Sequence, residues 1–438
     1  MLQIALLLMG SNFVRRNAPM LFLFSLLWCA AGTMVFTDGM VEESYFPLHV
    51  FGYFMLAESL LTLISASGTH GARRAIFCFK GGVFGFIALL IVSGQHNSNL
   101  LMAIIFGFAC FITGLFVIAS AWIVRYPHWR RAMFGGVLQL IFAIFLFLPY
   151  PARHDGTVPQ FIGMLMMLSG VQWAVMAFRL RRMRDGYRIF NMFAPNDLLT
   201  PDEVPPEVTQ PFTAQDGQRL TVHVWTPVGS AEATPIPRPV LNRYIAAVDS
   251  NGVISTGHAA LEMTPDIYIS LYPAADIDRS PSEFFNTLRA VRDNDVSGEF
   301  KKSYSVEAAE WCESDRKVVF FDFSPASLEH FWLRYRKYEI YNLTWRNCSS
   351  SVAYALEAAL DGVRGEKASW SHFLRLFFVP ELWIAAQLRK RATTMAWTPG
   401  LLLDYSRALH AIVHPVRLSW FKKGSQQSSA SKDRVNDR

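Results

Sequence analysis

The sequence predicts an α-helical membrane bundle of six helices followed by a cytoplasmic α+β domain. Two observations lead to this prediction. Residues 19–178 are almost entirely apolar, whereas residues 195–372 have the mixed composition of a soluble domain. Charged residues make up only 17% of the 438-residue chain, compared with about a quarter in a typical soluble protein. The two parts of the chain are therefore expected to face different solvents.

Six apolar runs are long enough to cross a bilayer, which takes about 20 helical residues. We expect these spans at 19–37, 46–66, 76–94, 100–122, 132–149 and 158–178. The connections between them are short, so neighbouring helices are predicted to be antiparallel.

The distribution of charge indicates how the bundle is oriented. One set of helix ends carries the basic residues Arg15, Arg16, Arg73, Arg74, Arg125, Arg130, Arg131, Arg179, Arg181, Arg182 and Arg184. The opposite connections carry mainly acidic or uncharged residues, with Asp38, Glu42 and Glu43 in the first and Arg153 with Asp155 in the last. Because Lys and Arg are enriched in cytoplasmic loops, both termini are predicted to be cytoplasmic.

The predicted spans contain an internal repeat of about 55 residues. Similar segments begin at Ala57, Ile112 and Leu168, and two further similar segments begin at Gly81 and Gly135. The period corresponds to one helical hairpin, which predicts three hairpins in tandem. The small residues in these segments are typical of close helix contacts in lipid.

The pattern of six helices, small-residue helix starts and short loops resembles the HdeD-like family of bacterial membrane proteins, over about residues 15–185. The resemblance implies a multi-pass protein of the bacterial inner (cytoplasmic) membrane with a role in acid and stress resistance. It implies no catalytic residues.

Glu58 is the one acidic residue well inside a predicted span. Intramembrane carboxylates are costly and often functional. One interpretation is a proton-coupled transport path. The favoured interpretation is a protonated or hydrogen-bonded Glu58 that joins helices, because no second ionisable partner is expected at that depth. Gln139 and Gln172 are the candidate partners.

The remaining composition divides the chain further. Residues 1–188 form the predicted transmembrane domain, which opens on a short interfacial segment, MLQIALLLMG. The Pro-rich, acidic residues 189–218 predict an extended linker, and residues 219–372 form the α+β domain. Residues 373–420 predict amphipathic helices that lie at the membrane interface or pack on the domain. The polar residues 421–438 predict a disordered tail.

The α+β domain has readable strand and helix signals. Strands are expected at 219–227, from 258 to 263, over 266–273 and at 317–323, with a hairpin turn at Asp249–Gly252. Helices are expected after Ser324, as N-cap, and from Cys348 to a stop at Gly362. Strand alternation places two sets of side chains on the face opposite the core, namely His258, Ala260 and Glu262, and Tyr268, Ser270 and Tyr272.

Cys348 is the candidate nucleophile, because a helix start and a nearby imidazole both lower the pKa of a thiol. His258 is the candidate base, because it follows Gly257 at the start of a rigid strand. Ser270 or Glu262 is expected to orient the imidazole, and Asn347 with the helix-opening N–H groups is a candidate for binding an oxyanion. The alternative is that Cys348 and His258 simply pack in the interior.

The segment TGHAALEM followed by RNCSSSVAYAL resembles the circularly permuted branch of the papain-like superfamily, which includes lecithin–retinol acyltransferase-like enzymes and permuted NlpC relatives. The resemblance covers about residues 219–362. It implies a permuted papain-like α+β fold and a Cys348–His258 pair with Ser270 as third member. It also implies thiol chemistry on an amide, ester or thioester acyl group. A site beside the membrane favours a lipid acyl chain or a protein or peptide as substrate.

Several classes of function are not indicated. The five cysteines form no disulfide or metal-binding pattern, so neither a metal site nor a cofactor is expected. The net charge of +6 is accounted for by the arginines beside the spans, and no nucleic-acid partner is expected. The main alternative to a membrane-anchored hydrolase or acyltransferase is a non-enzymatic HdeD-like stress-response protein with a degenerate papain-like binding domain.

Overall fold

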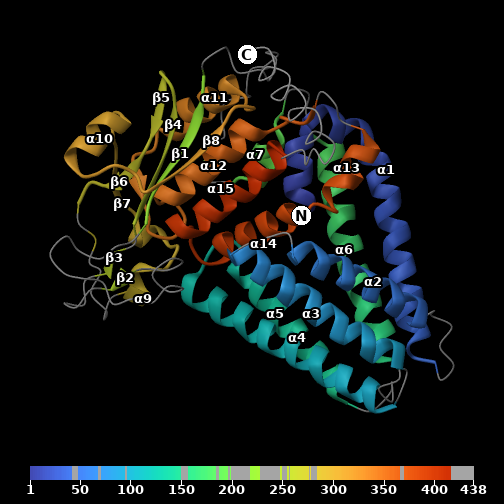
Figure 1. Cartoon of the computed structure of the whole chain (residues 1–438). Coiled ribbons are helices and arrows are strands. Elements are labelled where there is room, and N and C mark those ends of the chain that lie inside the picture. Colours follow the sequence, from blue (N-terminus) through green and yellow to red (C-terminus); the bar gives the residue numbers. More distant parts are fainter. Residues whose placement is uncertain are drawn as a thin grey trace, which may run out of the picture.

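The computed structural model describes residues 1–41, 48–67, 71–93, 96–148, 156–183, 187–195, 198, 218–226, 247–248, 254–255, 257–275, 277, 284–365 and 369–415. Six long helices make up one part of the molecule, and strands with shorter helices make up the other (Figure 1).

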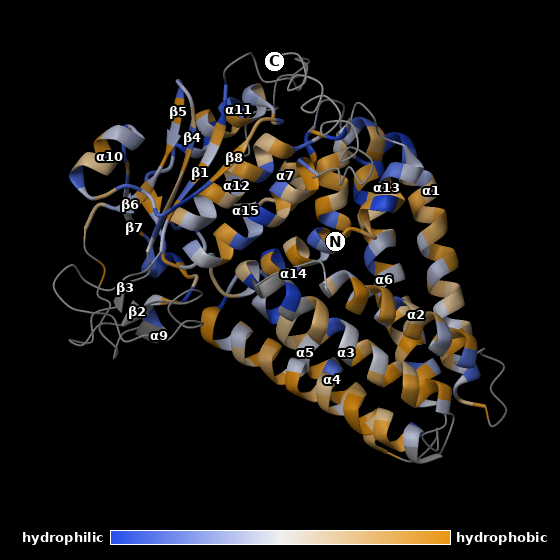
Figure 2. Cartoon of the chain, in the orientation of Figure 1, coloured by the Kyte–Doolittle hydropathy of each residue, from blue (hydrophilic) through white to orange (hydrophobic). Residues whose placement is uncertain are grey.

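The long helices lie where the apolar runs predict them. They are α1 (Leu2–Asp38), α2 (Leu48–Ser67), α3 (Gly71–Ser93), α4 (His96–Val124), α5 (Trp129–Phe147) and α6 (Thr157–Arg181). Five of them, all but α3, are long and apolar enough to cross a membrane, and the apolar stretch found in α3, Phe77–Ser93, is shorter. Hydrophobic residues dominate all six in Figure 2. The five apolar helices indicate a membrane protein.

The long helices pack as three pairs, α2 with α3, α4 with α5, and α6 with α1. Small residues lie in the contact of each pair. Ser59 Oγ donates to the Gly81 carbonyl at 2.7 Å, a Cβ at Gly114 would lie 3.1 Å from the Gly136 carbonyl oxygen, and a Cβ at Gly170 would lie 2.9 Å from that of Cys29. Ser59, Gly114 and Gly170 are spaced as the internal repeat predicts. Two pairs are consecutive hairpins, whereas the third joins the last helix to the first. The third pair of the repeat is therefore formed by the first and last long helices, and not by two consecutive ones.

A four-stranded antiparallel sheet forms the centre of the α+β part. Its order is β5 (Ile267–Ile269), β4 (His258–Met263), β1 (Leu220–Trp225) and β8 (Arg316–Phe320). One face packs in the main core against α11 (Pro325–Tyr335), α12 (Cys348–Leu360) and α15 (Pro399–Val413). The opposite face presents Trp225, Ala260 and Tyr268, as the predicted alternation requires.

Smaller elements surround this sheet. A three-stranded sheet contains β6 (Leu271–Pro273), β7 (Val296–Phe300) and β9 (Ile340–Tyr341), and β2 (Ala247–Val248) pairs with β3 (Ile254–Ser255). The hairpin turn predicted at Asp249–Gly252 lies outside the described residues. The remaining helices are α7 (Ile189–Phe193), α9 (Phe284–Thr287), the 3₁₀ turn η1 (Arg292–Asn294), α10 (Tyr304–Glu310), α13 (Trp370–Leu376) and α14 (Pro380–Thr394). The strand predicted over 266–273 is divided at Ser270 between β5 and β6.

Most of the N-terminal segment lies in the core of the α+β part, which differs from the predicted interfacial position. Ile4–Met9 are buried, and two backbone carbonyls accept hydrogen bonds from the turn after α12, Gly362 N–H to Leu7 and Arg364 N–H to Leu8, both at 2.8 Å. The chain bends at Gly10, whose φ of 77° suits glycine. This packing buries the apolar side chains of the segment within the protein instead of at the bilayer surface.

The predicted linker and C-terminal helices also contribute to the core. Phe190 of α7 is buried, and its N–H donates to Asp361 Oδ2 at 2.8 Å. Most of α15 is buried against β1 and β8, so this helix packs within the domain. Most of the linker and the tail predicted at 421–438 lie outside the described residues.

Candidate active site

Cys348 is the first residue of α12, and a capping box fixes its position. Asn347 Oδ1 accepts the N–H of Ser350 at 2.8 Å, and Ser350 Oγ accepts the N–H of Asn347 at 2.8 Å. This reciprocal pair satisfies two helix-start donors. The Cys348 side chain is therefore presented from a rigid helix start, and the residue is only 7% exposed.

Asn347 has a structural role in this arrangement. Its Nδ2 donates to the carbonyls of Leu343 at 2.7 Å and Trp397 at 2.9 Å. Both amide hydrogens are thus engaged, and the side chain cannot donate to an oxyanion in this conformation. The backbone N–H groups at the start of α12 are the better candidates for that task.

His258 is the first residue of β4. Gly257 precedes it with a φ of 70°, a left-handed conformation that glycine adopts without strain. The imidazole stacks on Tyr272, with ring centroids 4.1 Å apart, and its Nε2 lies 2.8 Å from Ser270 Oγ. The residue is 4% exposed. The structure thus brings together His258 and Ser270, the base and third member that the sequence suggested.

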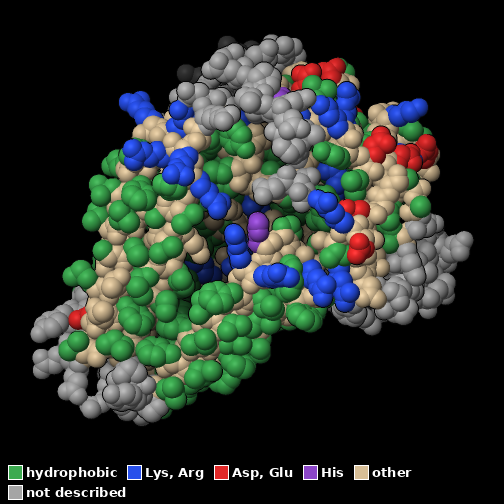
Figure 3. Space-filling model, turned by 180° about the vertical axis from the view of Figure 1, so that it is seen from behind, with side chains coloured by type: hydrophobic (Ala, Val, Ile, Leu, Met, Phe, Trp, Pro, Cys, Tyr) green, Lys and Arg blue, Asp and Glu red, His purple; other side chains and the backbone are tan. Residues whose placement is uncertain are grey.

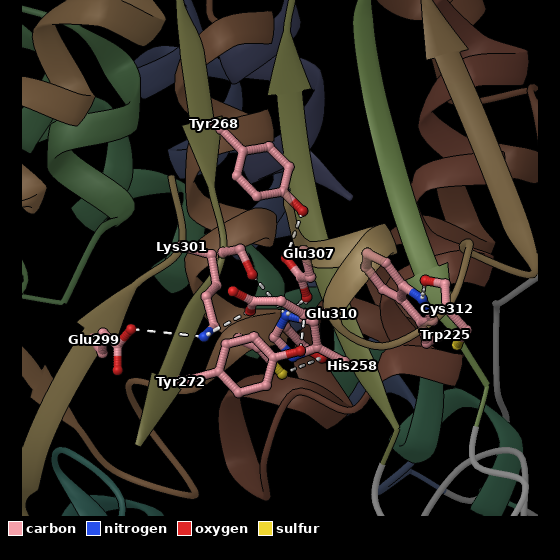
Figure 4. A network of polar contacts seen from close by, with 12 residues as sticks. Trp225, His258, Tyr268, Tyr272, Glu299, Lys301, Glu307, Glu310 and Cys312 are labelled. Carbon is pink, nitrogen blue, oxygen red and sulfur yellow. Dashed lines mark hydrogen bonds and ion pairs between the residues drawn. The ribbon is translucent and has the colours of Figure 1, made fainter. Parts of the chain in front are cut away.

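Glu307 is a site residue that the sequence analysis missed. This buried residue of α10 places Oε1 3.2 Å from His258 Nε2. Tyr272 donates to the same oxygen at 2.7 Å, and Tyr268 donates to Oε2 at 2.6 Å. Figure 4 shows the two phenols and the imidazole converging on this carboxylate. The arrangement supplies an anionic partner for the imidazole.

Two signals in the sequence could have pointed to Glu307. The predicted site face carried Tyr268 and Tyr272, and buried phenols require acceptors. Ser303 is the N-cap of α10 and accepts the N–H of Val306, so a short helix at 304–310 was recognisable. What the sequence did not supply was the packing of this helix on the sheet.

Cys348 lies against the start of β4. The backbone N–H of Ala259, the residue next to His258, interacts with the Cys348 sulfur and lowers the pKa of the thiol. Because Ser270 and Glu307 both face Nε2, a neutral imidazole carries its proton on Nε2 and its lone pair on Nδ1. The remaining nitrogen is then the one available to a thiol.

Burial dominates the protonation of both groups. It lowers the pKa of His258 to about 4, although Glu307 acts in the opposite direction. It also raises the pKa of the Cys348 thiol, and hydrogen bonds from Ser349 and Ala259 offset only part of the effect. The resting pair is therefore a neutral thiol beside a neutral imidazole.

Glu262 contacts a different histidine. It lies four residues beyond His258, or about 13 Å along the strand, and its Oε2 is 3.2 Å from His223 Nε2. The other ring nitrogen of His223 lies 3.0 Å from Ser314 Oγ. Glu262 therefore contacts His223, together with Ser314, and does not orient His258.

Glu58 has an ionisable partner that the sequence analysis did not expect. Lys80 Nζ lies 2.6 Å from Glu58 Oε1, and Thr62 donates to the same oxygen at 3.2 Å. Gln139, a predicted partner, instead bonds to Thr113. A charge pair between α2 and α3 favours the helix-joining interpretation over a transport path.

The loop before Cys348 is fastened to the long helix α4 through two sets of contacts. The carbonyl of Val124, at the end of α4, accepts the N–H of Ala290 at 2.7 Å, and Thr344 of the loop donates to the neighbouring Leu288 carbonyl at 2.6 Å. Ser120 of α4 donates to the carbonyl of Thr394 at 2.7 Å, close in sequence to the Trp397 carbonyl that binds Asn347. The candidate nucleophile therefore lies on a part of the domain that is docked on the bundle.

The described residues contain no group of three His, Cys, Asp or Glu side chains suited to hold a metal ion. Comparisons of the chain with protein-family models, curated proteins and solved structures found no match.

Proposed function

We propose that the chain is a membrane-anchored cysteine hydrolase or acyltransferase, in which Cys348 is the nucleophile and His258 the base. The observation that supports this most is the position of His258. Its Nε2 faces Ser270 and the Glu307 carboxylate, while its neighbour Ala259 contacts the Cys348 sulfur. A nucleophile, a base and a group that orients the base are the three parts of such a site.

The first half of the reaction forms an acyl-enzyme. The Cys348 thiol gives its proton to His258 Nδ1 as the sulfur bonds to the carbonyl carbon of an amide, ester or thioester. Glu307 and Ser270 stabilise the resulting imidazolium through Nε2–H. N–H groups at the start of α12 bind the oxyanion. The bond to the leaving group then breaks, and His258 returns the proton to the leaving amine, alcohol or thiol.

The second half releases the acyl group. Water or an acceptor alcohol or amine gives a proton to His258 Nδ1 and attacks the thioester carbonyl. The carbon–sulfur bond breaks, and the sulfur recovers the proton as a thiol. Hydrolysis and acyl transfer differ only in the acceptor.

The order and spacing of Gly-His and Asn-Cys, which resemble the permuted papain-like branch, support this proposal. For the membrane half we propose six spans, an HdeD-like bundle and cytoplasmic termini in a bacterial inner membrane, as the arginine distribution suggests. The substrate would then be an acyl lipid, or an acylated protein or peptide, at the cytoplasmic membrane surface. A reporter that is active only in the cytoplasm should be active when it is fused to the C-terminus. A reporter that is active only outside the cytoplasm should be inactive at the same position.

The test of the chemistry is an electrophilic, thiol-directed acyl probe applied to the full chain in detergent. We expect labelling at Cys348, located by peptide mass spectrometry, and a decrease of about 10²- to 10⁴-fold in His258→Ala. Cys312→Ser is the matched control, because Cys312 is an exposed thiol outside the site and its loss should leave Cys348 labelling unchanged. Equal, slow labelling of the wild-type chain and His258→Ala would refute the proposal.

The second candidate is a non-enzymatic membrane protein with a papain-like binding domain. It is favoured by the burial of the pair, since Cys348 is 7% and His258 4% exposed. In that case Cys348 should be unreactive toward the probe at every pH at which the chain stays folded.

A further inference from the structure

The turn between α13 and α14 leaves large apolar side chains uncovered. Phe378 is 85% exposed, the highest value for a large apolar side chain among the described residues, and Leu374 and Trp383 are 54% and 44% exposed. We call these three residues the apolar turn. The opposite sides of the same helices are packed, with Phe373, Leu376 and Leu382 buried. The packing of the domain does not require the exposed side, and leaving large apolar side chains in water is unfavourable.

One side of the apolar turn adjoins α1. The Phe13 ring packs edge-on against Trp370, with centroids 6.1 Å apart, and Trp370 Nε1 donates to Asn17 Oδ1 at 2.8 Å. The outward apolar surface of α1 includes Met20 and Leu23. These residues lie about 5–9 Å further along the helix axis than Asn17. The docking point of α13 is therefore next to the part of α1 expected to face lipid.

The other side of the apolar turn adjoins α3. Lys80 Nζ lies 5.7 Å from the centroid of the Trp383 ring, and the neighbouring Phe79 is one of the most exposed side chains of the long helices. The apolar turn is thus bounded on both sides by helices whose apolar side chains point outward. It continues their surface.

The charges around the apolar turn match a membrane boundary. Arg16 and Arg375 are exposed, and Trp with Lys or Arg is the combination enriched at the level of lipid headgroups. Figure 3 shows Lys and Arg side chains gathered above the apolar surface of the long helices on one face of the molecule. Anionic headgroups are the matching partners for such basic residues.

We propose that the apolar turn inserts into the bilayer leaflet on the side of the α+β part, with Phe378 entering furthest. The occupant of this surface is the lipid itself, with anionic headgroups beside Arg16 and Arg375. The contact would fix α14 at the membrane surface. Since Arg389 of α14 binds Glu357 of α12, it would also link lipid to the helix that begins with Cys348. This inference is independent of the proposed chemistry.

The test uses the full chain, with its five cysteines replaced, reconstituted in vesicles of phosphatidylcholine and phosphatidylglycerol. An environment-sensitive NBD label is attached at Phe378→Cys, and at Phe321→Cys as the control. Phe321 is 54% exposed but lies at the end of β8, beside His414. We expect blue-shifted emission and strong quenching by doxyl-labelled lipid at position 378, with neither effect at position 321.

Equal behaviour at the two positions would overturn the proposal. A blue shift without quenching by doxyl lipid, lost on dilution to one copy per vesicle, would identify a second copy of the chain as the occupant and would also overturn it. Leu374→Cys gives an independent reading of the same surface if Phe378→Cys does not fold.

Discussion

His258 Nε2 lies 3.2 Å from Glu307 Oε1, and both side chains are buried. The contact joins the first residue of β4 to the short helix α10. The hydroxyl groups of Tyr268 and Tyr272 also donate hydrogen bonds to this carboxylate. The position and tautomer of the imidazole therefore depend on Glu307 as well as on the predicted Ser270.

Glu307→Gln tests this relationship. Gln retains the size of the side chain but loses the charge that stabilises the imidazolium. We expect labelling of Cys348 by the acyl probe to fall at least about tenfold, with a smaller change in thermal unfolding temperature. Tyr268→Phe, which removes one hydrogen bond to Glu307 but leaves the charge, is the matched control. A Glu307→Gln rate equal to that of Tyr268→Phe would contradict the assignment.

The pH dependence of Cys348 alkylation distinguishes a neutral pair from an ion pair. Burial raises the pKa of the Cys348 thiol and lowers that of His258 to about 4. The rate with iodoacetamide, which reacts with the thiolate, should therefore increase with pH through the neutral and alkaline range. This rate is measured by stopping the alkylation at a series of times and quantifying modified Cys348 by mass spectrometry. A fast, level rate below pH 6 would instead indicate a thiolate–imidazolium pair.

Folding stability should decrease in mild acid because of His258 and His223. Burial lowers the pKa of each to about 4, whereas in the unfolded chain a histidine binds a proton near pH 6.5. The unfolded state thus binds more protons between about pH 4 and 6.5. The free energy of unfolding falls as pH falls through that window, by about 2 kcal/mol per histidine at pH 5.

The measurement is the difference in unfolding temperature between pH 7.5 and pH 5, in detergent. Asp361, whose pKa burial raises to about 6, acts in the opposite direction, but its contribution cancels between variants. His223→Gln should therefore reduce the difference in unfolding temperature between pH 7.5 and pH 5. An unchanged difference would show that His223 is protonated in the folded state.

The buried ion pair between Glu357 and Arg389 should be essential for stability. Arg389 Nε and Nη2 donate to the two Glu357 oxygens at 2.7 and 3.0 Å, and Tyr405 donates to one of them at 2.8 Å. Arg389→Met leaves a buried, unpaired carboxylate and should cost about 3–5 kcal/mol. Adding Glu357→Gln removes that charge and should recover part of the loss. Denaturant unfolding in detergent tests both, and a double variant as unstable as Arg389→Met would argue against this explanation.

Gly10 should tolerate no side chain. Its φ is 77°, and a Cβ there would lie 2.7 Å from the Cα of Gly362. Gly10→Ala should therefore lower stability by about 1–3 kcal/mol, read as a lower unfolding temperature. Gly82→Ala is the matched control, because a Cβ at Gly82 meets no atom within 4 Å. Equal effects of the two substitutions would show that residues 1–10 are not packed as described.

Local patterns predicted much of the fold. The long apolar runs correspond to the six long helices, and five of these can span a membrane by length and composition. Strand alternation correctly separated Ala260 and Tyr268 from the core residues Leu261 and Ile269. The start of α12 at Cys348 was likewise predicted. In each case the signal lies within a few neighbouring residues.

Other features depend on contacts between distant segments, which a single sequence does not reveal. The N-terminal segment, although apolar enough for the membrane surface, is buried against the turn after α12. Glu58 meets Lys80, and Glu262 meets His223 instead of His258. Each outcome depends on which surface packs against which.

Residue patterns along the chain predicted the long apolar helices, the strand faces and the candidates Cys348 and His258, because hydropathy and periodicity are local properties. Only the tertiary structure showed that Glu307 faces His258, because that contact requires α10 to pack on the face of β4. Tertiary packing also decided the protonation of the site. Burial keeps both Cys348 and His258 neutral, opposing the effect expected from a helix start and a neighbouring histidine.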